Sequence, residues 1–160
     1  MKILIAGFEG NDNSAKILLD NIKEKHNEDV LYLENDFEVS SNQIEEKLKE
    51  EYDYVLIFGQ KPNTKNIYLE NNANLNETEL VTDYYYGVLR EKLEDNNYKV
   101  ISSCDAGNYL CNNVFYTALN FKQNNNLKTK IAFIHIPTID NIENITNLSN
   151  AILSYIKNLL

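Results

Sequence analysis

Residues that can act as a nucleophile or proton carrier are rare in this chain of 160 residues, which has two cysteines and two histidines. Cys104 and Cys111 lie at the start of a segment with helical periodicity. The N-terminus of a helix presents unpaired N–H groups and a partial positive charge, which lower the pKa of a thiol and can bind an oxyanion. Cys111 falls in the first turns of this helix. Its position predicts a nucleophile that is more reactive than Cys104.

A thiol nucleophile also needs a group that takes up and returns its proton. His135, in an apolar segment, is a better candidate than His26, which lies in the charged stretch KEKHNED. The imidazole in turn needs an acceptor that fixes its tautomer, and Glu70 is a carboxylate with apolar rather than charged neighbours. Cys111, His135 and Glu70 therefore form a candidate triad.

Each member of this triad also has an ordinary structural explanation. A cysteine on an apolar helix face usually packs in the core, and we assign that role to Cys104. A histidine in an apolar strand is usually a hydrogen-bonded core residue, and a single glutamate is usually an ordinary loop carboxylate. Residue types and spacing alone leave both explanations open.

The elements that would position these residues alternate along the chain. Apolar residues at helical spacing and capping residues such as Ser40 and Ser41 separate the β-branched and aromatic runs. Strands are predicted at 2–8, 30–34, 52–59, near 66–71, at 98–103 and 130–137, and helices from about 14, after 41, at 81–94, after 104 and at 144–160. We expect one α/β domain over residues 1–160, a three-layer α/β/α fold whose mostly parallel central sheet has helices on both faces.

Ligands of open parallel sheets bind beyond the carboxyl ends of the strands. Phe8 ends the first predicted strand, Gln60 follows the third, Cys111 follows strand 98–103, and His135 is near the end of the last. We therefore expect these residues to meet at one edge of the sheet.

Charge and hydropathy exclude several classes of partner. The net charge of -9 repels a phosphate backbone, and Arg90 is the only arginine, so we expect no nucleic-acid partner. No apolar stretch approaches the roughly 20 residues that span a bilayer, and MKILIAGFEG is typical of a strand rather than a signal peptide. We expect a cytoplasmic protein without a membrane partner, a disulfide, a metal or a cofactor.

The segment DAGNYLCNNVFYTALNF (105–121), followed by AFIHIP (132–137), resembles the pyroglutamyl peptidase I family, or pyrrolidone-carboxylate peptidases. In that family an A-G-x-Y/F-[LV]-C-N-x-x-F/Y-Y segment carries the nucleophile, and an F-[IV]-H-[IV]-P segment carries the general base and acid. The resemblance implies these roles for Cys111 and His135. The segment IYLENNA (67–73) is similar to the family's I-S-x-E-R-V-A pattern, which implies that Glu70 is the third member.

What the resemblance implies is a cysteine exopeptidase that removes N-terminal pyroglutamate from peptides through a thioester acyl-enzyme. GFEG and FGQ resemble family segments near the substrate, which implies substrate-binding roles for Phe8 and Gln60. The family commonly forms tetramers, so a homo-oligomer is implied as well. The resemblance spans almost the whole chain, with shortened connections.

Departures from the family pattern concern the substrate pocket more than the catalytic residues. The second Phe and the Gly-Gly of G-F-x-P-F-G-G are missing, KPN replaces the G-G-R that follows Gln60, and the Arg after the Glu motif has no counterpart. Tyr84, Tyr85 and Tyr86, from the same chain or from a neighbouring subunit, are candidates to replace the lost aromatic wall. Two alternatives stay open: an inactive relative that acts as a binding or assembly protein, and a cysteine hydrolase of altered specificity. A phosphate-binding turn at GFEGNDNSAK is a weaker alternative, because it lacks G-x-G-x-x-G and a P-loop Lys.

Overall fold

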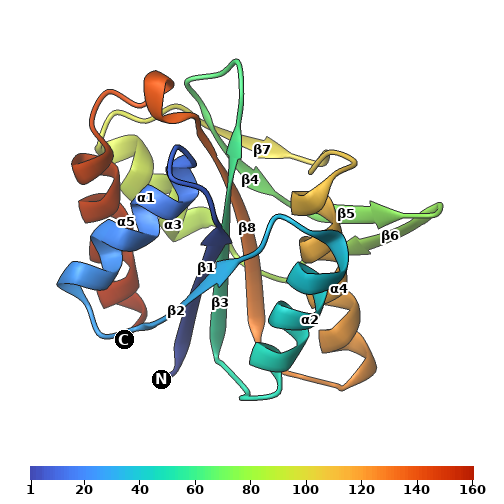
Figure 1. The fold of residues 1–160 in the computed structure, drawn as a ribbon. Coiled ribbons are helices and arrows are strands. Elements are labelled where there is room, and N and C mark those ends of the chain that lie inside the picture. The colour runs from blue at the N-terminus through green and yellow to red at the C-terminus, as the bar shows by residue number, and fades with distance from the viewer.

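A computed structural model describes residues 1–160 as three layers with a six-stranded sheet in the middle (Figure 1). The strand order is β2-β1-β3-β8-β4-β7. The strands of this sheet are β1 (Ile3–Phe8), β2 (Asp29–Leu33), β3 (Tyr54–Lys61), β4 (Ile67–Glu70), β7 (Val100–Ser103) and β8 (Lys130–Pro137). The predicted three-layer α/β/α fold with a mostly parallel sheet is confirmed.

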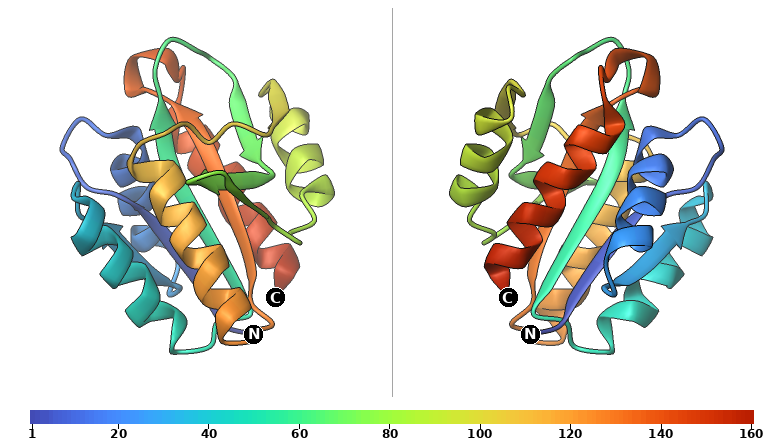
Figure 2. Two further views of the ribbon diagram at one scale, coloured as in Figure 1. Left: turned by 90° about the vertical axis from the view of Figure 1, so that its right-hand side faces the viewer. Right: turned by 90° about the vertical axis from the view of Figure 1, so that its left-hand side faces the viewer.

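Helices cover both faces of the sheet, and Figure 2 shows the two faces in turn. One face is covered by α1 (Ser14–Lys25), α3 (Gly87–Asp95) and α5 (Ile145–Leu159), and the other by α2 (Phe37–Leu48) and α4 (Leu110–Asn124). Successive strand residues point to opposite faces, so the fully buried strands supply both cores. A short 3-10 helix, η1 (Ile139–Asn141), connects β8 to α5.

Strand direction divides the sheet into two parts. β1 pairs in parallel with β2 and β3, and β3 with β8, whereas β4 is antiparallel to β8 and parallel to β7. β4 and β7 thus run opposite to the rest. The rule about carboxyl ends therefore applies to Phe8, Gln60 and His135 but not to Cys111, which follows the reversed strand β7. Glu70 is the last residue of the other reversed strand, β4.

A two-stranded hairpin, β5 (Asn72–Leu75) and β6 (Thr78–Val81), extends to one side beyond α4 in Figure 1. The sequence prediction missed it. Its two-residue turn is Asn76–Glu77, and both residues have positive φ. Turns of this kind favour Asn followed by Gly, so the Glu removes the usual sequence signal.

Two helix starts also differ from the prediction. α2 begins at Phe37, because the side chain of Asp36 accepts a hydrogen bond from the Val39 N–H, so Ser40 and Ser41 lie inside the helix. α3 begins at Gly87 rather than near 81, because the β6 hairpin strand occupies that part of the chain.

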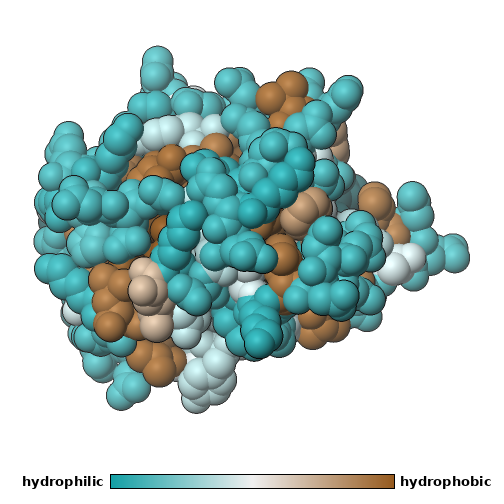
Figure 3. Space-filling model, turned by 90° about the horizontal axis from the view of Figure 1, so that it is seen from below, coloured by the Kyte–Doolittle hydropathy of each residue, from teal (hydrophilic) through white to brown (hydrophobic).

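Both chain termini lie at the lower edge of the sheet in Figure 1, where β1 and β8 begin. Figure 3 shows this edge as a mainly hydrophilic surface with hydrophobic residues scattered over it. None of the helices has the length and apolar character needed to cross a bilayer.

Candidate active site

Glu70 and His135 form a buried pair between β4 and β8. Glu70 is fully buried and His135 is 5% exposed. Glu70 Oε1 lies 2.8 Å from His135 Nδ1. In the antiparallel register Glu70 pairs with Phe133, so Glu70 and His135 are diagonal neighbours on the same sheet face and the long carboxylate side chain reaches the ring. This contact orients the imidazole and leaves Nε2 without a hydrogen-bond partner, available for proton transfer.

The sulfur of Cys111 lies against Gly59 on the same face of the sheet. A Cβ atom added to Gly59 would be 2.6 Å from Cys111 Sγ and 3.1 Å from Phe133 Cζ. Gly59 pairs with His135 in the parallel register of β3 and β8. The missing side chain at Gly59 therefore makes room for the sulfur next to the histidine strand. The structure thus brings together the three predicted triad residues from α4, β8 and β4.

Cys111 is the second residue of α4, and the N-terminus of this helix has no side-chain cap. α1, α2 and α5 each begin after an Asn or Asp whose side chain accepts a backbone N–H bond, whereas α4 begins after Tyr109, which makes no such bond. Its first N–H groups are thus left to another acceptor. A negatively charged oxygen bound to Cys111 Sγ would be such an acceptor.

The predicted lowering of the Cys111 pKa is wrong. Burial raises the pKa of the Cys111 thiol to about 12, and the negative charge of Glu70 acts in the same direction, whereas the backbone N–H of Cys111 and the positive charge of Lys61 oppose this shift. The resting thiol is therefore neutral near pH 7. Cys104 is exposed in the loop before α4, so the prediction that it packs in the core is wrong. The predicted order of reactivity of the two cysteines with small alkylating reagents therefore does not follow from the resting protein.

Comparisons with known proteins bear on the family and the fold. Residues 88–156 match the family model described as pyroglutamyl peptidase. The matched part contains Cys111 and His135, whereas Glu70 precedes it. The resemblance to the pyroglutamyl peptidase family is confirmed. This family match, together with the fold, supports a cysteine peptidase. No curated protein matches the chain.

Solved pyrrolidone carboxyl peptidases share the fold. A mutant enzyme from Pyrococcus furiosus has a TM-score of 0.84 at 19% identity, with 98% of this chain and 97% of that chain covered. The enzyme from Thermococcus litoralis has a TM-score of 0.78 at 22% identity, covering 99% of this chain and 96% of that one. For the Fervidobacterium islandicum enzyme the values are 0.82 and 20%, with 99% and 98% covered. At these identities the likeness establishes the pyroglutamyl peptidase fold.

Within this pyroglutamyl peptidase fold, the hydroxyl of Tyr86 contacts the main chain of both strands that carry the Glu70–His135 pair. Its hydroxyl donates to the Glu70 carbonyl oxygen at 2.8 Å and accepts from the Phe133 N–H at 3.0 Å. It therefore joins β4 to β8 at the register position next to His135. The sequence prediction gave Tyr86 a different role, because a tertiary contact to main-chain atoms leaves no local pattern.

Within one chain, Tyr84, Tyr85 and Tyr86 do not line the space at Cys111, and a contribution from a neighbouring subunit stays a prediction. Tyr84 is buried in the core beneath α3 and α5 and hydrogen-bonds to Tyr155. Tyr85 is exposed and lines a cavity with Tyr54 and Lys130, which are the first residues of β3 and β8. This cavity lies at the edge of the sheet opposite to Cys111.

Phe8 and Gln60 lie on different faces of the sheet. Phe8 is 3% exposed and belongs to the core beneath α2 and α4, on the Cys111 side. Gln60 follows Gly59 in β3 and so points to the other face, where its Oε1 accepts from the Ser14 N–H at 3.1 Å. The structure therefore does not bring the Gln60 side chain to Cys111. Gln60 and the Asn13 cap instead occupy the start of α1, which removes the geometric basis for a phosphate-binding turn there.

Asn112, directly after Cys111, attaches α4 to the β5–β6 hairpin. Its Oδ1 accepts from the Asn74 N–H at 3.0 Å and its Nδ2 donates to the Asn74 carbonyl at 2.7 Å. Asn112 is 6% exposed, so the oxygen and the nitrogen of its buried side-chain amide both find a hydrogen-bond partner in one residue of β5. This pair of bonds fixes the first turn of α4 relative to the hairpin.

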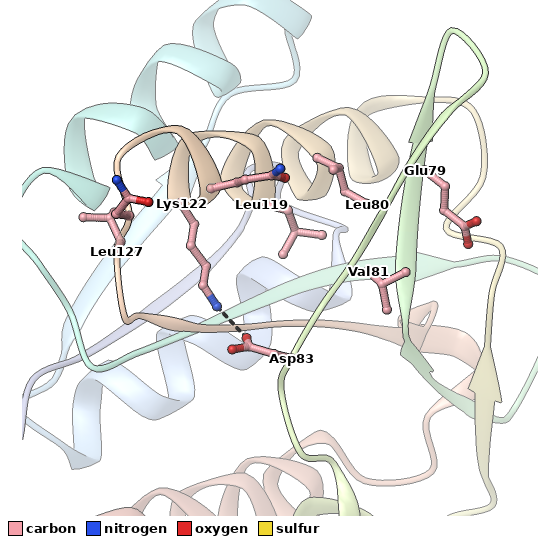
Figure 4. A pocket seen from close by; sticks show the side chains of 9 residues that line it. Glu79, Leu80, Val81, Asp83, Leu119, Lys122 and Leu127 are labelled. Atoms are coloured by element: carbon pink, nitrogen blue, oxygen red, sulfur yellow. Dashed lines mark hydrogen bonds and ion pairs between the residues drawn. The ribbon is translucent and has the colours of Figure 1, made fainter.

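A cavity of about 660 Å³ lies away from the triad, between β6 and the C-terminal half of α4. Figure 4 shows Lys122 of α4 and Asp83 pointing toward each other across it, as the ion pair between them requires. The cavity is lined by no cysteine or histidine. No group of three or more His, Cys, Asp or Glu side chains is arranged to hold a metal ion.

Gly59→Ala is expected to lower kcat by about tenfold to a hundredfold while the chain still folds. The new Cβ would overlap Cys111 Sγ, which must then move away from the histidine strand, and displacements of about 1 Å cost about a hundredfold in well-aligned reactions. Overpacking should cost about 1–3 kcal/mol of stability. Steady-state kinetics and thermal unfolding measure both. Gly7→Ala, whose new Cβ would press on Leu19 of α1 instead, is the control for overpacking at a strand glycine, and an unchanged kcat in Gly59→Ala would contradict the placement of the sulfur.

Proposed function

We propose that the protein is a cysteine exopeptidase that removes N-terminal pyroglutamate from peptides. The observation that carries the proposal is the buried contact of Glu70 Oε1 with His135 Nδ1 at 2.8 Å, on the sheet face where the Cys111 sulfur lies against Gly59. A buried carboxylate that orients an imidazole beside a thiol is the arrangement that nucleophilic acyl transfer needs. The family match over residues 88–156 supports the choice of this substrate class.

In the proposed reaction, His135 Nε2 accepts the Cys111 proton as Sγ forms a bond to the scissile carbonyl carbon. The carbonyl oxygen becomes an oxyanion, which the uncapped N–H groups of α4 stabilise. His135 returns the proton to the leaving nitrogen as the C–N bond breaks, which gives a thioester and the shortened peptide. Water, deprotonated by His135, then hydrolyses the thioester and releases pyroglutamate.

Glu70 stabilises the imidazolium that forms between these steps. A histidine that is 5% exposed would carry its positive charge at a high desolvation cost without a neighbouring anion. The same negative charge raises the pKa of the Cys111 thiol. Thus Glu70 disfavours a free thiolate at rest and favours the state in which the proton resides on His135.

The substrate group itself is a neutral lactam, for which apolar walls are suitable. Phe8, on the Cys111 side of the sheet, is the proposed contact for the ring. A homo-oligomer and a cytoplasmic location stay predictions.

The proposal is tested with the purified protein and fluorogenic amides of pyroglutamate, proline, alanine and glutamine. We expect turnover of the pyroglutamyl amide alone. Equal turnover of the other amides would instead indicate a cysteine hydrolase of altered specificity. A protein that turns over none of them but binds pyroglutamyl peptides in calorimetry would be the inactive binding relative.

A further inference from the structure

Lys61 is a positively charged residue on the Cys111 side of the sheet, and the family motifs give it no role. It lies two residues after Gly59 in β3, so its side chain starts from the same face. It is partly buried, and it makes no ion pair with an acidic side chain. Its ammonium group lies 4.5 Å from the centre of the Tyr68 ring. Lys61 is therefore a positive charge near Cys111 that no acidic side chain of the protein neutralises.

The Lys61–Tyr68 contact lies beside His135. Tyr68 pairs with His135 across β4 and β8, and Lys61 pairs with Pro137 across β3 and β8. The lysine side chain therefore reaches from β3 across β8 to the ring on β4. Its charge also acts on the sulfur, since it lowers the pKa of the Cys111 thiol against the effect of burial. The cation is thus electrostatically part of the candidate active site.

The chemistry of the proposed reaction determines which part of a substrate would meet this cation. The imidazole of His135 must reach the leaving nitrogen in order to protonate it. The residue that follows the scissile bond therefore passes on the His135 side, where Lys61 and Tyr68 lie. The pyroglutamyl ring is neutral and has no negative charge that could pair with a cation. A carboxylate on the residue after the scissile bond would supply one.

We propose that Lys61, held over Tyr68, is a carboxylate-binding subsite for the residue that follows pyroglutamate in the substrate. This inference rests on the proposed function and narrows it to a substrate class. The carboxylate comes either from an acidic side chain at that position or from the free C-terminus of a pyroglutamyl dipeptide. The structural alternative is that Lys61 only packs on Tyr68 and takes no part in recognition.

Four peptides separate these possibilities: pyroglutamyl-glutamate amide, pyroglutamyl-alanine with a free carboxylate, pyroglutamyl-alanine amide and pyroglutamyl-lysine amide. We expect kcat/KM of the wild-type protein to be about fivefold to tenfold higher for at least one carboxylate peptide than for alanine amide, and lowest for lysine amide. The carboxylate peptide with the higher value identifies the source of the charge. The preference should weaken with added salt.

Variants assign the preference to Lys61. In Lys61→Met the ratio between carboxylate and neutral peptides should fall to about one, whereas Lys61→Arg should keep it. Lys65→Met, at an exposed lysine in the following loop, is the matched control and should keep the wild-type ratio. A wild-type protein without the preference, or a Lys61→Met variant that retains it, would overturn the inference while leaving the proposed function intact.

If no peptide is hydrolysed, the proposed function fails, and the subsite is then judged by binding. Calorimetry with the same four peptides and the Cys111→Ala variant, with and without Lys61→Met, gives the same comparison without turnover. Tighter binding of a carboxylate peptide that disappears with Lys61→Met supports the subsite. Equal affinities for all four peptides contradict it.

Discussion

Cys111→Ala is expected to lower kcat/KM on a pyroglutamyl amide by about 10⁴-fold or more. The alanine has no atom that can form the thioester, and no other thiol or hydroxyl is placed against Gly59. His135 and Glu70 would keep their contact, because neither hydrogen-bonds to Cys111. The variant should therefore still bind substrate. Kinetics for activity and calorimetry for binding measure the two effects separately.

Cys104→Ala is the matched control for this variant, because it removes the only other thiol. Cys104 is exposed in the loop between β7 and α4, and its replacement should leave kcat/KM within about twofold of the wild type. Comparable losses in both cysteine variants would refute the assignment of Cys111 as the nucleophile.

Glu70→Gln is expected to lower kcat by about 10³- to 10⁴-fold with little change in KM. The glutamine amide is nearly isosteric but can donate a hydrogen bond to His135 Nδ1, which leaves the proton on Nε2. That tautomer cannot accept the Cys111 proton. The substitution also removes a negative charge that raises the pKa of the Cys111 thiol, so this pKa should fall in the variant. Activity and thiolate formation are therefore expected to change in opposite directions.

Two measurements check this expectation: steady-state kinetics, and titration of the thiol by the ultraviolet absorbance of the thiolate. Glu94→Gln is a suitable control, because Glu94 is an exposed carboxylate of α3 that pairs with Arg90 away from the triad. It should leave kcat unchanged. A Glu70→Gln variant with a lower thiol pKa and higher kcat would mean that the resting thiol pKa, rather than the orientation of His135, limits the reaction.

The layers and most strands were predictable because their signals are local. Runs such as YVLIFG and KIAFIHIP are apolar throughout, as expected for strands covered on both faces, and they occur as β3 and β8. The position of Cys111 near a helix start was also local information. Strand direction was not, because the reversal of β4 and β7 depends on which neighbours pair in the finished sheet.

The environment of the site residues could not be predicted from the sequence either, because it also depends on how distant segments pack together. The position of Cys111 in its helix predicts a lowered thiol pKa, and only the packing of β3, β4 and α4 around the sulfur reverses that direction. Gln60 and Gly59 are adjacent in sequence but act on opposite faces of the sheet. Gln60 accepts a hydrogen bond from the start of α1, and Gly59 makes room for the Cys111 sulfur. Tyr86 acts through main-chain atoms that any sequence would supply.

The two hydrogen bonds between Asn112 and Asn74 make the position of the first turn of α4 sensitive to substitutions in the β5–β6 hairpin. A change that twists the hairpin without unfolding it carries the main chain of Asn74 with it, and the first turn of α4 must follow or give up both bonds. Such a change would be nearly silent in a thermal melt, because the hairpin contributes little to either core. It would nevertheless alter turnover, since the sulfur is one residue away. Substitutions in this hairpin are therefore expected to change turnover more than stability.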